Sequence, residues 1–179
     1  EKYIQAKKFG YPDKVIDMCA APGGKTFAAA VAGAGNIISC DIYEHKVSLV
    51  SNGAQRLGFE NITALQQDAA VFYPEWEKKM DVVISDVPCS GYGIIRKKPD
   101  IRYKDPKTME DLPDLQKAIL SNQSRYVKPG GLLMVEGANS ELEEDKIPEA
   151  VKEQIESVKQ YKFSKCYVYF VKMKEEGIQ

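Results

Sequence analysis

The sequence predicts an α/β fold in which a mostly parallel, twisted β-sheet is covered by helices on both faces. Short apolar runs of strand length alternate along the chain with segments that have helical periodicity. A glycine-rich turn joins the first apolar run to the first helical segment, and aspartates follow several of the runs. Alternation of this kind is typical of parallel sheets, whose strands end at one shared edge.

The first half of the chain is predicted to contain three strands and two helices. The strands are the apolar runs at residues 15–16, 37–40 and 62–67. The helices cover residues 26–33 and 44–57, and Gly58 is expected to cap the second one. The second helix carries apolar side chains at helical spacing, which indicate a buried face. These side chains are Val47, Val50, Ala54 and Leu57.

The second half is predicted to contain three further strands and two helices. The strands are the runs at residues 82–85, 132–135 and 166–171. A helix over residues 112–126 tolerates Pro113 in its first turn and ends before Pro129. Its apolar face consists of Leu112, Leu115 and Ile119. A last helix is predicted over residues 148–160, because Val151, Ile155 and Val158 have helical spacing. Only one strand is then marked at the C-terminal end of the sheet.

The segment from Asp17 to Thr26 reads DMCAAPGGKT and predicts a ligand-binding turn. Its glycines let a ligand approach the backbone, and the start of the following helix favours a negatively charged group. The next apolar run ends in Asp41, where doubly wound folds place the carboxylate that binds a ribose. These features predict a nucleoside-binding unit.

The details of the turn narrow the choice of nucleoside. A phosphate-binding P-loop needs a glycine where this chain has Cys19, and a dinucleotide turn needs one where it has Ala21. The remaining layout is the one used for S-adenosylmethionine (SAM), with the amino-acid end on the turn and the ribose on Asp41. The alternative is an ordinary strand–helix turn in which the glycines only tighten the connection.

A second candidate segment, Asp86-Val87-Pro88-Cys89, follows the strand at residues 82–85. Ligands bind beyond the carboxyl ends of the strands in open α/β sheets. A cysteine thiolate beside a carboxylate at this place suits covalent chemistry on an electron-poor ring. The alternative is that Cys89 is a small buried residue in a loop.

Several segments together resemble the motifs of the RNA cytosine-5 methyltransferases, the Nop/Sun family, in their order and intervals. The bacterial small-subunit ribosomal RNA branch (RsmB-like) is the most similar. The segments are DMCAAPGGKT, CDIYEHK, QQDA, SDVPCSGYGIIRKKPDIR and VKPGG, within residues 12–136. The resemblance implies a Rossmann-like class I SAM-dependent methyltransferase that methylates carbon 5 of cytosine in RNA, with ribosomal RNA as the expected substrate.

The resemblance also implies residue roles. Asp41 would accept hydrogen bonds from the ribose, and Asp68 would lie near the adenine. Asp86 would lie between the cofactor and the target base, Cys89 would be the family's Pro-Cys cysteine, and Lys25, Asp86 and Cys89 are the expected catalytic residues. The methionine part of SAM would lie on Cys19, Ala20, Ala21, Pro22, Gly23, Gly24 and Lys25.

The implied reaction begins when a thiolate adds to carbon 6 of cytosine. Carbon 5 then attacks the SAM methyl group, a base removes the proton on carbon 5, and the thiolate leaves. A carboxylic acid such as Asp86, hydrogen-bonded to the edge of the ring, would stabilise the adduct.

One position departs from the family pattern. The attacking cysteine usually follows the Gly-Gly pair in a Thr-Cys motif, but Ala138 stands there in this chain, while the acidic pair Glu143-Glu144 still matches. Three interpretations remain open: an inactive form that still binds SAM, Cys89 as the nucleophile, or Cys166 as its substitute. The alternative to an enzyme is therefore a non-catalytic SAM-binding module with a regulatory role.

Composition limits the other possibilities. The 179 residues suit one domain over residues 1–179, and the formal net charge of −1 gives weak support for autonomous RNA binding. A basic segment from Arg96 to Lys107 could guide an RNA backbone. The four cysteines lack Cys-x-x-Cys spacing and there is one histidine, so we expect neither disulfides nor a metal site. Without a visible signal peptide or membrane span, we expect a cytoplasmic monomer that lacks the family's N-terminal RNA-binding region.

Overall fold

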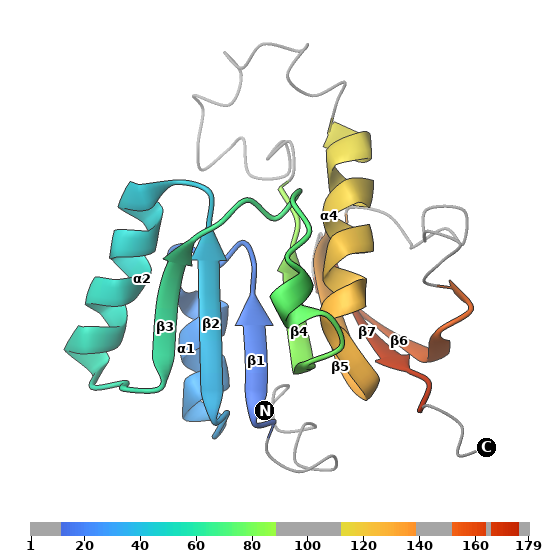
Figure 1. Cartoon of the computed structure of the whole chain (residues 1–179), viewed down its shortest axis with the longest axis horizontal. Coiled ribbons are helices and arrows are strands. Elements are labelled where there is room, and N and C mark those ends of the chain that lie inside the picture. The colour runs from blue at the N-terminus through green and yellow to red at the C-terminus, as the bar shows by residue number, and fades with distance from the viewer. Residues whose placement is uncertain (1–11, 89–111, 139–151, 164–165, 176–179) are drawn as a thin grey trace.

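The computed structural model describes residues 12–88, 112–138, 152–163 and 166–175, and within them the chain forms a seven-stranded sheet. The strand order is β3-β2-β1-β4-β5-β7-β6 (Figure 1). Strands β1 to β5 are parallel, whereas β7 runs antiparallel to both β5 and β6. The strands are β1 (Lys14–Asp17), β2 (Asn36–Asp41), β3 (Ile62–Gln66), β4 (Met80–Asp86), β5 (Val127–Ala138), β6 (Ile155–Phe163) and β7 (Cys166–Met173). The helical elements are α1 (Gly24–Val31), α2 (Glu44–Leu57), η2 (Pro74–Trp76) and α4 (Leu112–Tyr126).

The sheet separates two apolar cores. Side chains alternate between the faces of a strand, so Leu133 belongs to one core and its neighbour Met134 to the other. The core that contains Leu133 also contains Ile119 and Tyr126 of α4, whereas Met134 shares its core with Ala29 of α1. Figure 1 shows α4 in front of the sheet and α1 behind it. The predicted helices on both faces are confirmed.

The helices follow the expected signals. Helices α2 and α4 have the predicted bounds, and α1 begins two residues before the predicted start. Gly58 ends α2 in a left-handed conformation (φ 74°), so the prediction that it caps this helix is confirmed. Three predicted core positions, Leu57, Leu115 and Val158, are instead exposed. Leu57 is the last residue of α2, so no further turn continues the buried stripe beyond it.

The predicted helix over residues 148–160 is wrong, because residues 155–163 form the edge strand β6. A register irregularity between Ile155 and Ser157 explains the helical spacing. Ile155 pairs with Met173, and Val158 pairs with Val171, two residues back along β7, so the bulge places both apolar residues on one face. Strand β6 is therefore the C-terminal strand that the sequence pattern did not mark, and Val151 lies outside the described residues.

Candidate functional site

Acidic residues gather at the edge where the parallel strands end. Asp17, Asp41 and Asp86 are the last residues of β1, β2 and β4, and Asp68 follows β3. Glu136, near the end of β5, is the register partner of Asp86. Because all five strands run in the same direction, these carboxylates share the edge at which α/β proteins bind their ligands.

The turn between β1 and α1 is hydrogen-bonded to the neighbouring strand β2 and leaves open space beside Gly24. The Ala20 N–H donates to the carbonyl of Cys40 (2.8 Å), and the Gly23 N–H donates to the carbonyl of Ala20 (2.7 Å). Gly23 has a φ of 108° and caps α1. A Cβ added at Gly24 would meet no heavy atom within 4 Å. The backbone at the start of α1 is therefore open to a ligand.

Lys25 is held between two carboxylates. Its Nζ lies 2.5 Å from Oδ2 of Asp86 and 3.2 Å from Oε2 of Glu136. Burial lowers the pKa of Lys25, but the hydrogen bonds and negative charges of Asp86 and Glu136 outweigh burial and raise this pKa overall. Lys25 is therefore a permanent cation that compensates the charges at the ends of β4 and β5.

Replacing Lys25 by glutamine leaves Asp86 and Glu136 as neighbouring carboxylates without their cation. We expect the free energy of unfolding at pH 7 to fall by about 1–2 kcal/mol, the cost of leaving a half-buried group without its charged partner. Urea unfolding at pH 7 measures the effect. Lys25→Gln combined with Glu136→Gln should recover most of the lost stability, because it removes one of the two facing carboxylates. No recovery in the double variant would contradict the ion-pair explanation.

A second polar group lies below the turn and is completely buried. The Thr26 hydroxyl donates to Oδ2 of Asp17 (3.0 Å) and shares a hydrogen bond with the Ser39 hydroxyl (2.9 Å). Oδ1 of Asp17 is buried without a hydrogen-bond partner. Burial is the main cause that raises the pKa of Asp17 to about 7, against the lowering effects of Thr26 and Lys25. Thr26, the residue after Lys25, is thus anchored to the ends of β1 and β2.

Asp41 and Asp68 are each held by local backbone N–H groups. The carboxylate Oδ1 of Asp41 accepts a hydrogen bond from the Tyr43 N–H (3.3 Å) and lies 3.6 Å from Nζ of Lys46. Oδ1 of Asp68 accepts from the Ala70 N–H (2.8 Å). Asp41 is buried and Asp68 partly buried, so both are fixed at the strand ends and not free on the surface.

The described cysteines near the turn, Cys19 and Cys40, lie in surroundings that favour the neutral thiol. Burial, followed by the charge of Asp17, raises the pKa of both Cys19 and Cys40 to about 12, so both remain thiols at neutral pH. The predicted catalytic Cys89 and the basic segment 96–107 lie outside the described residues.

Strand β7 brings another cysteine position to this edge. Ala138, which stands where the family's nucleophile is expected, lies at the end of β5, and its register partner is Tyr167. Cys166 precedes Tyr167 as the first residue of β7. Because β7 is antiparallel to β5, the backbone of Cys166 lies at the same edge of the sheet as Ala138. The sequence offered no reason for this placement.

Glu136 is the site residue that the sequence interpretation missed. The available signal was a charged residue directly after the apolar run at residues 132–135. Asp17, Asp41 and Asp86 lie at one edge, as their positions after strands suggested, and Lys25 reaches this edge from α1. Their roles toward a ligand stay predictions. Within the described ranges, no cluster of His, Cys, Asp and Glu could hold a metal ion, and no helix is long and apolar enough to cross a membrane.

Comparison with protein families points to one family. The family model described as 16S rRNA methyltransferase RsmB/F matches residues 8–176. The probable ribosomal RNA small subunit methyltransferase B of Bacillus subtilis is 40% identical over 126 residues, which cover 68% of this chain and 28% of the relative. The ribosomal RNA small subunit methyltransferase F of Salmonella paratyphi C is 32% identical over 127 residues, covering 69% and 26%. The chain therefore spans less than a third of the length of these relatives.

Solved structures share the fold. NSun6 from Pyrococcus horikoshii superimposes with a TM-score of 0.70 and 23% identity, covering 97% of this chain and 51% of that one. The N-methyltransferase NodS from Bradyrhizobium japonicum, in complex with S-adenosyl-L-homocysteine, superimposes with a TM-score of 0.66 and 13% identity. This match covers 97% of this chain and 86% of that one. These likenesses confirm the Rossmann-like class I methyltransferase fold that the sequence predicts.

Proposed function

Because this chain belongs to the 16S rRNA methyltransferase RsmB/F family, we propose that its residues 1–179 form the SAM-binding catalytic domain of an RNA cytosine-5 methyltransferase. Small-subunit ribosomal RNA is the proposed substrate. The observation that carries the proposal is the Lys25 ion-pair cluster beside the open backbone of Gly24, at the carboxyl edge of a methyltransferase sheet. A monomer in the cytoplasm, where bacterial ribosomal RNA is modified, is part of the same proposal.

The residues at this edge fit SAM. The free backbone at Gly24 and the N-terminus of α1 suit the carboxylate of the methionine part. Asp41 is a fixed carboxylate at the end of β2 that accepts from ribose hydroxyls, and Asp68 lies one strand further along, toward the adenine. The other turn residues, Cys19 to Gly23, shape the path of the backbone. When bound, SAM supplies an electrophilic methyl group.

Asp86 is the residue of this chain that would act on the target base. Its Oδ2 is engaged by Lys25, so Oδ1 is the oxygen that would hydrogen-bond to the edge of the cytosine. Lys25 holds the Asp86 carboxylate in place and compensates its charge. Cys89 follows this aspartate closely in sequence, and the basic segment Arg96–Lys107 would guide the RNA past it.

The chemistry depends on which thiol attacks carbon 6, because Ala138 stands at the family's nucleophile position. A methyltransferase domain without any attacking thiol would bind SAM but transfer no methyl group. The second candidate function is therefore a non-catalytic SAM-binding module, and Ala138 is the observation that favours it. Cys89 and Cys166 are the thiols that could replace the missing one.

Methyl transfer from labelled SAM to unmodified small-subunit ribosomal RNA tests the proposal, with the chain and Ala138→Cys side by side. We expect Ala138→Cys to raise the initial rate by at least a hundredfold, since it restores the covalent route through carbon 6. Transfer by the unaltered chain that is lost in Cys89→Ser or Cys166→Ser would identify the substituting thiol. Covalent trapping on RNA that contains 5-fluorocytosine should give the same answer. Absence of SAM binding in calorimetry would overturn the proposed function altogether.

A further inference from the structure

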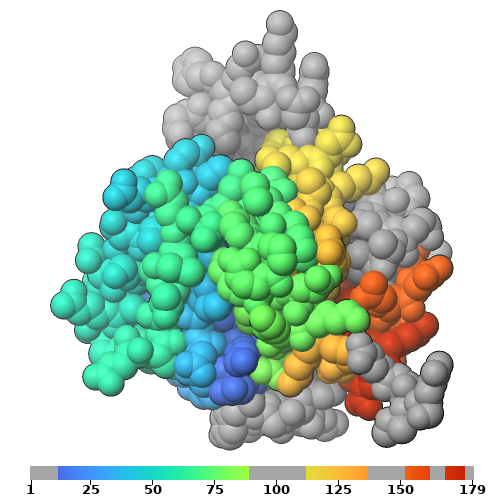
Figure 2. All heavy atoms as spheres, viewed as in Figure 1, coloured from blue at the N-terminus to red at the C-terminus, as the bar shows by residue number. Residues whose placement is uncertain are grey.

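The segment that carries Asp68 rests on the C-terminal half of α4. Nδ2 of Asn122 donates to the carbonyl of Ala70 (2.7 Å) and, at longer distance, to that of Ala69 (3.4 Å). Residues 69–70 directly follow Asp68. Figure 2 shows the green atoms of the connection between β3 and β4 lying beside the yellow and orange atoms of α4. One helical side chain therefore bonds to two consecutive backbone carbonyls of this segment.

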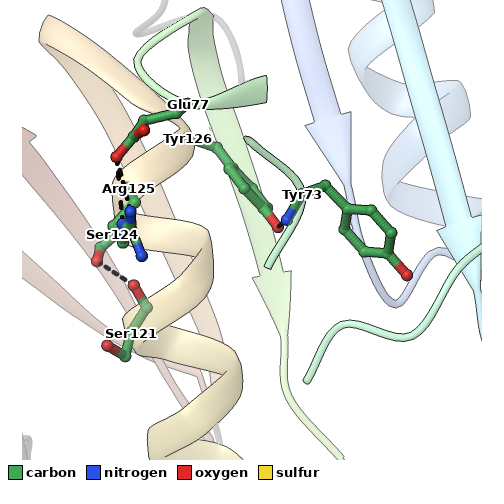
Figure 3. Close-up of polar contacts among 6 residues, drawn as sticks. All are labelled: Tyr73, Glu77, Ser121, Ser124, Arg125 and Tyr126. Atoms are coloured by element: carbon green, nitrogen blue, oxygen red, sulfur yellow. Dashed lines mark hydrogen bonds and ion pairs between the residues drawn. The ribbon is translucent and has the colours of Figure 1, made fainter. Parts of the chain in front are cut away.

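Tyr126, the last residue of α4, holds the same segment further along. Its hydroxyl accepts a hydrogen bond from the Tyr73 N–H (2.9 Å) and donates to the carbonyl of Val71 (3.3 Å). Figure 3 shows the Tyr73 nitrogen facing this hydroxyl while the Tyr73 ring points away. Burial is the main cause that raises the pKa of Tyr126 to about 12, so the hydroxyl keeps the proton that it donates.

Ring contacts reinforce the hydrogen bonds. Phe72 stacks on Tyr126 with ring centroids 5.6 Å apart, and the guanidinium of Arg125 lies 3.5 Å from the centroid of Phe72. Glu77 fixes this guanidinium through a 2.9 Å ion pair, which is drawn in Figure 3. Phe72 is thus packed between two consecutive side chains of α4. The segment after Asp68 is therefore held by α4 both through its backbone hydrogen bonds and through the Phe72 side chain.

These contacts reach Asp68 through two residues. The Asp68 N–H donates to the hydroxyl of Tyr73 (3.1 Å), and its Oδ1 accepts from the Ala70 N–H (2.8 Å). The Ala70 carbonyl accepts a hydrogen bond from Asn122, and the Tyr73 N–H donates one to the Tyr126 hydroxyl. The backbone and the carboxylate of Asp68 are therefore both set by residues that α4 holds in place.

We propose that Asn122 and Tyr126 are positioning residues that set the affinity of the site for the adenine end of its cofactor, because they hold the segment of Asp68. This inference rests on the proposed function, in which Asp68 lies near the adenine. A preformed contact avoids the cost of ordering a loop when the ligand binds. The competing interpretation is that these contacts stabilise the fold and leave ligand affinity unchanged.

Calorimetric titration of Asn122→Ala with SAM and with methylthioadenosine tests the inference. Methylthioadenosine keeps the adenosine half and lacks the amino acid. We expect the dissociation constants of both ligands to rise by about tenfold, as for the loss of one or two hydrogen bonds. Tyr73→Phe, which removes the acceptor of the Asp68 N–H, should act in the same direction. In an Asp68→Asn background, Asn122→Ala should cause at most a twofold further change.

Ser124→Ala is the matched control. Ser124 lies on the same helix and is buried, but its hydroxyl donates to the Ser121 carbonyl within the helix (Figure 3). The Ser124→Ala substitution should leave the dissociation constants of SAM and methylthioadenosine within twofold of those of the unaltered chain. Thermal unfolding verifies that each variant is folded at the titration temperature. If Asn122→Ala is unfolded, the titration of Tyr73→Phe tests the inference.

Two results would overturn the inference while leaving the proposed function intact. One is unchanged affinity in folded Asn122→Ala and Tyr73→Phe, and the other is weaker binding of SAM with unchanged binding of methylthioadenosine. An unaltered chain that binds neither ligand would instead overturn the proposed function, and the inference with it.

Discussion

Replacing Gly23 by alanine should lower the free energy of unfolding by about 3–5 kcal/mol, the sum of two costs. Gly23 has a φ of 108°, a conformation that side chains other than glycine rarely adopt. A Cβ there would also lie 2.5 Å from Cζ of Phe27. The Phe27 ring cannot move aside easily, because a Cβ at Gly53 of α2 would lie equally close to the same atom. The ring therefore fills the space between the two glycines.

Gly24→Ala is the control for Gly23→Ala and separates folding from ligand binding. An added Cβ at Gly24 meets no heavy atom within 4 Å, so stability should change by less than about 1 kcal/mol. The same methyl group would occupy the open backbone where the methionine part of SAM is proposed to lie, and affinity should fall. Urea unfolding and calorimetric titration measure the two effects. Equal destabilisation by both substitutions would contradict the role assigned to the Phe27 ring.

Asp17→Asn should change how stability depends on pH. The pKa of Asp17 is about 7 in the folded chain, mainly because of burial, and near 3.9 for an unfolded aspartate. The folded state thus binds more protons between these values, and its stability falls as pH rises from about 4 to 7. The loss is on the order of 4 kcal/mol. Asparagine does not ionise, so the variant should lack this loss. Its free energy of unfolding should therefore rise relative to that of the unaltered chain as pH rises.

Urea unfolding at pH 5, 6, 7 and 8 measures this difference, and Asp81→Asn is the control, because its effect on stability should stay constant over this pH range. Burial raises the pKa of Asp81, but the hydrogen bonds and charge of Lys128 and the N–H of Lys14 lower it overall. Its stabilising effect is present at neutral pH and is lost as pH falls through the folded pKa. Parallel stability curves for Asp17→Asn and the unaltered chain would show that folding does not raise the pKa of Asp17 as its burial implies.

Much of the fold could be predicted because local signals and tertiary packing agree in the first five strands. Buried parallel strands read as continuous apolar runs, and Gly58 marks the end of α2. The carboxylates Asp41 and Asp86 were found because they follow such runs, and parallel strands bring their ends together. The motif order also predicts that Ala138 stands at the nucleophile position, and the methyl-transfer experiment tests this prediction.

Other features depend on contacts between residues far apart in the chain, which no local pattern encodes. The bulge in β6 gives Ile155 and Val158 the spacing of a helix, and only pairing with β7 shows that they belong to a strand. Glu136 joins Lys25 because β5 lies beside β4 in matching register. Asn122 reaches the segment after Asp68 because α4 packs in front of the sheet. The residues alone thus specified the family, the strand–helix order and the site edge, whereas register and packing between distant segments set the ion pairs, the last strands and the support of Asp68.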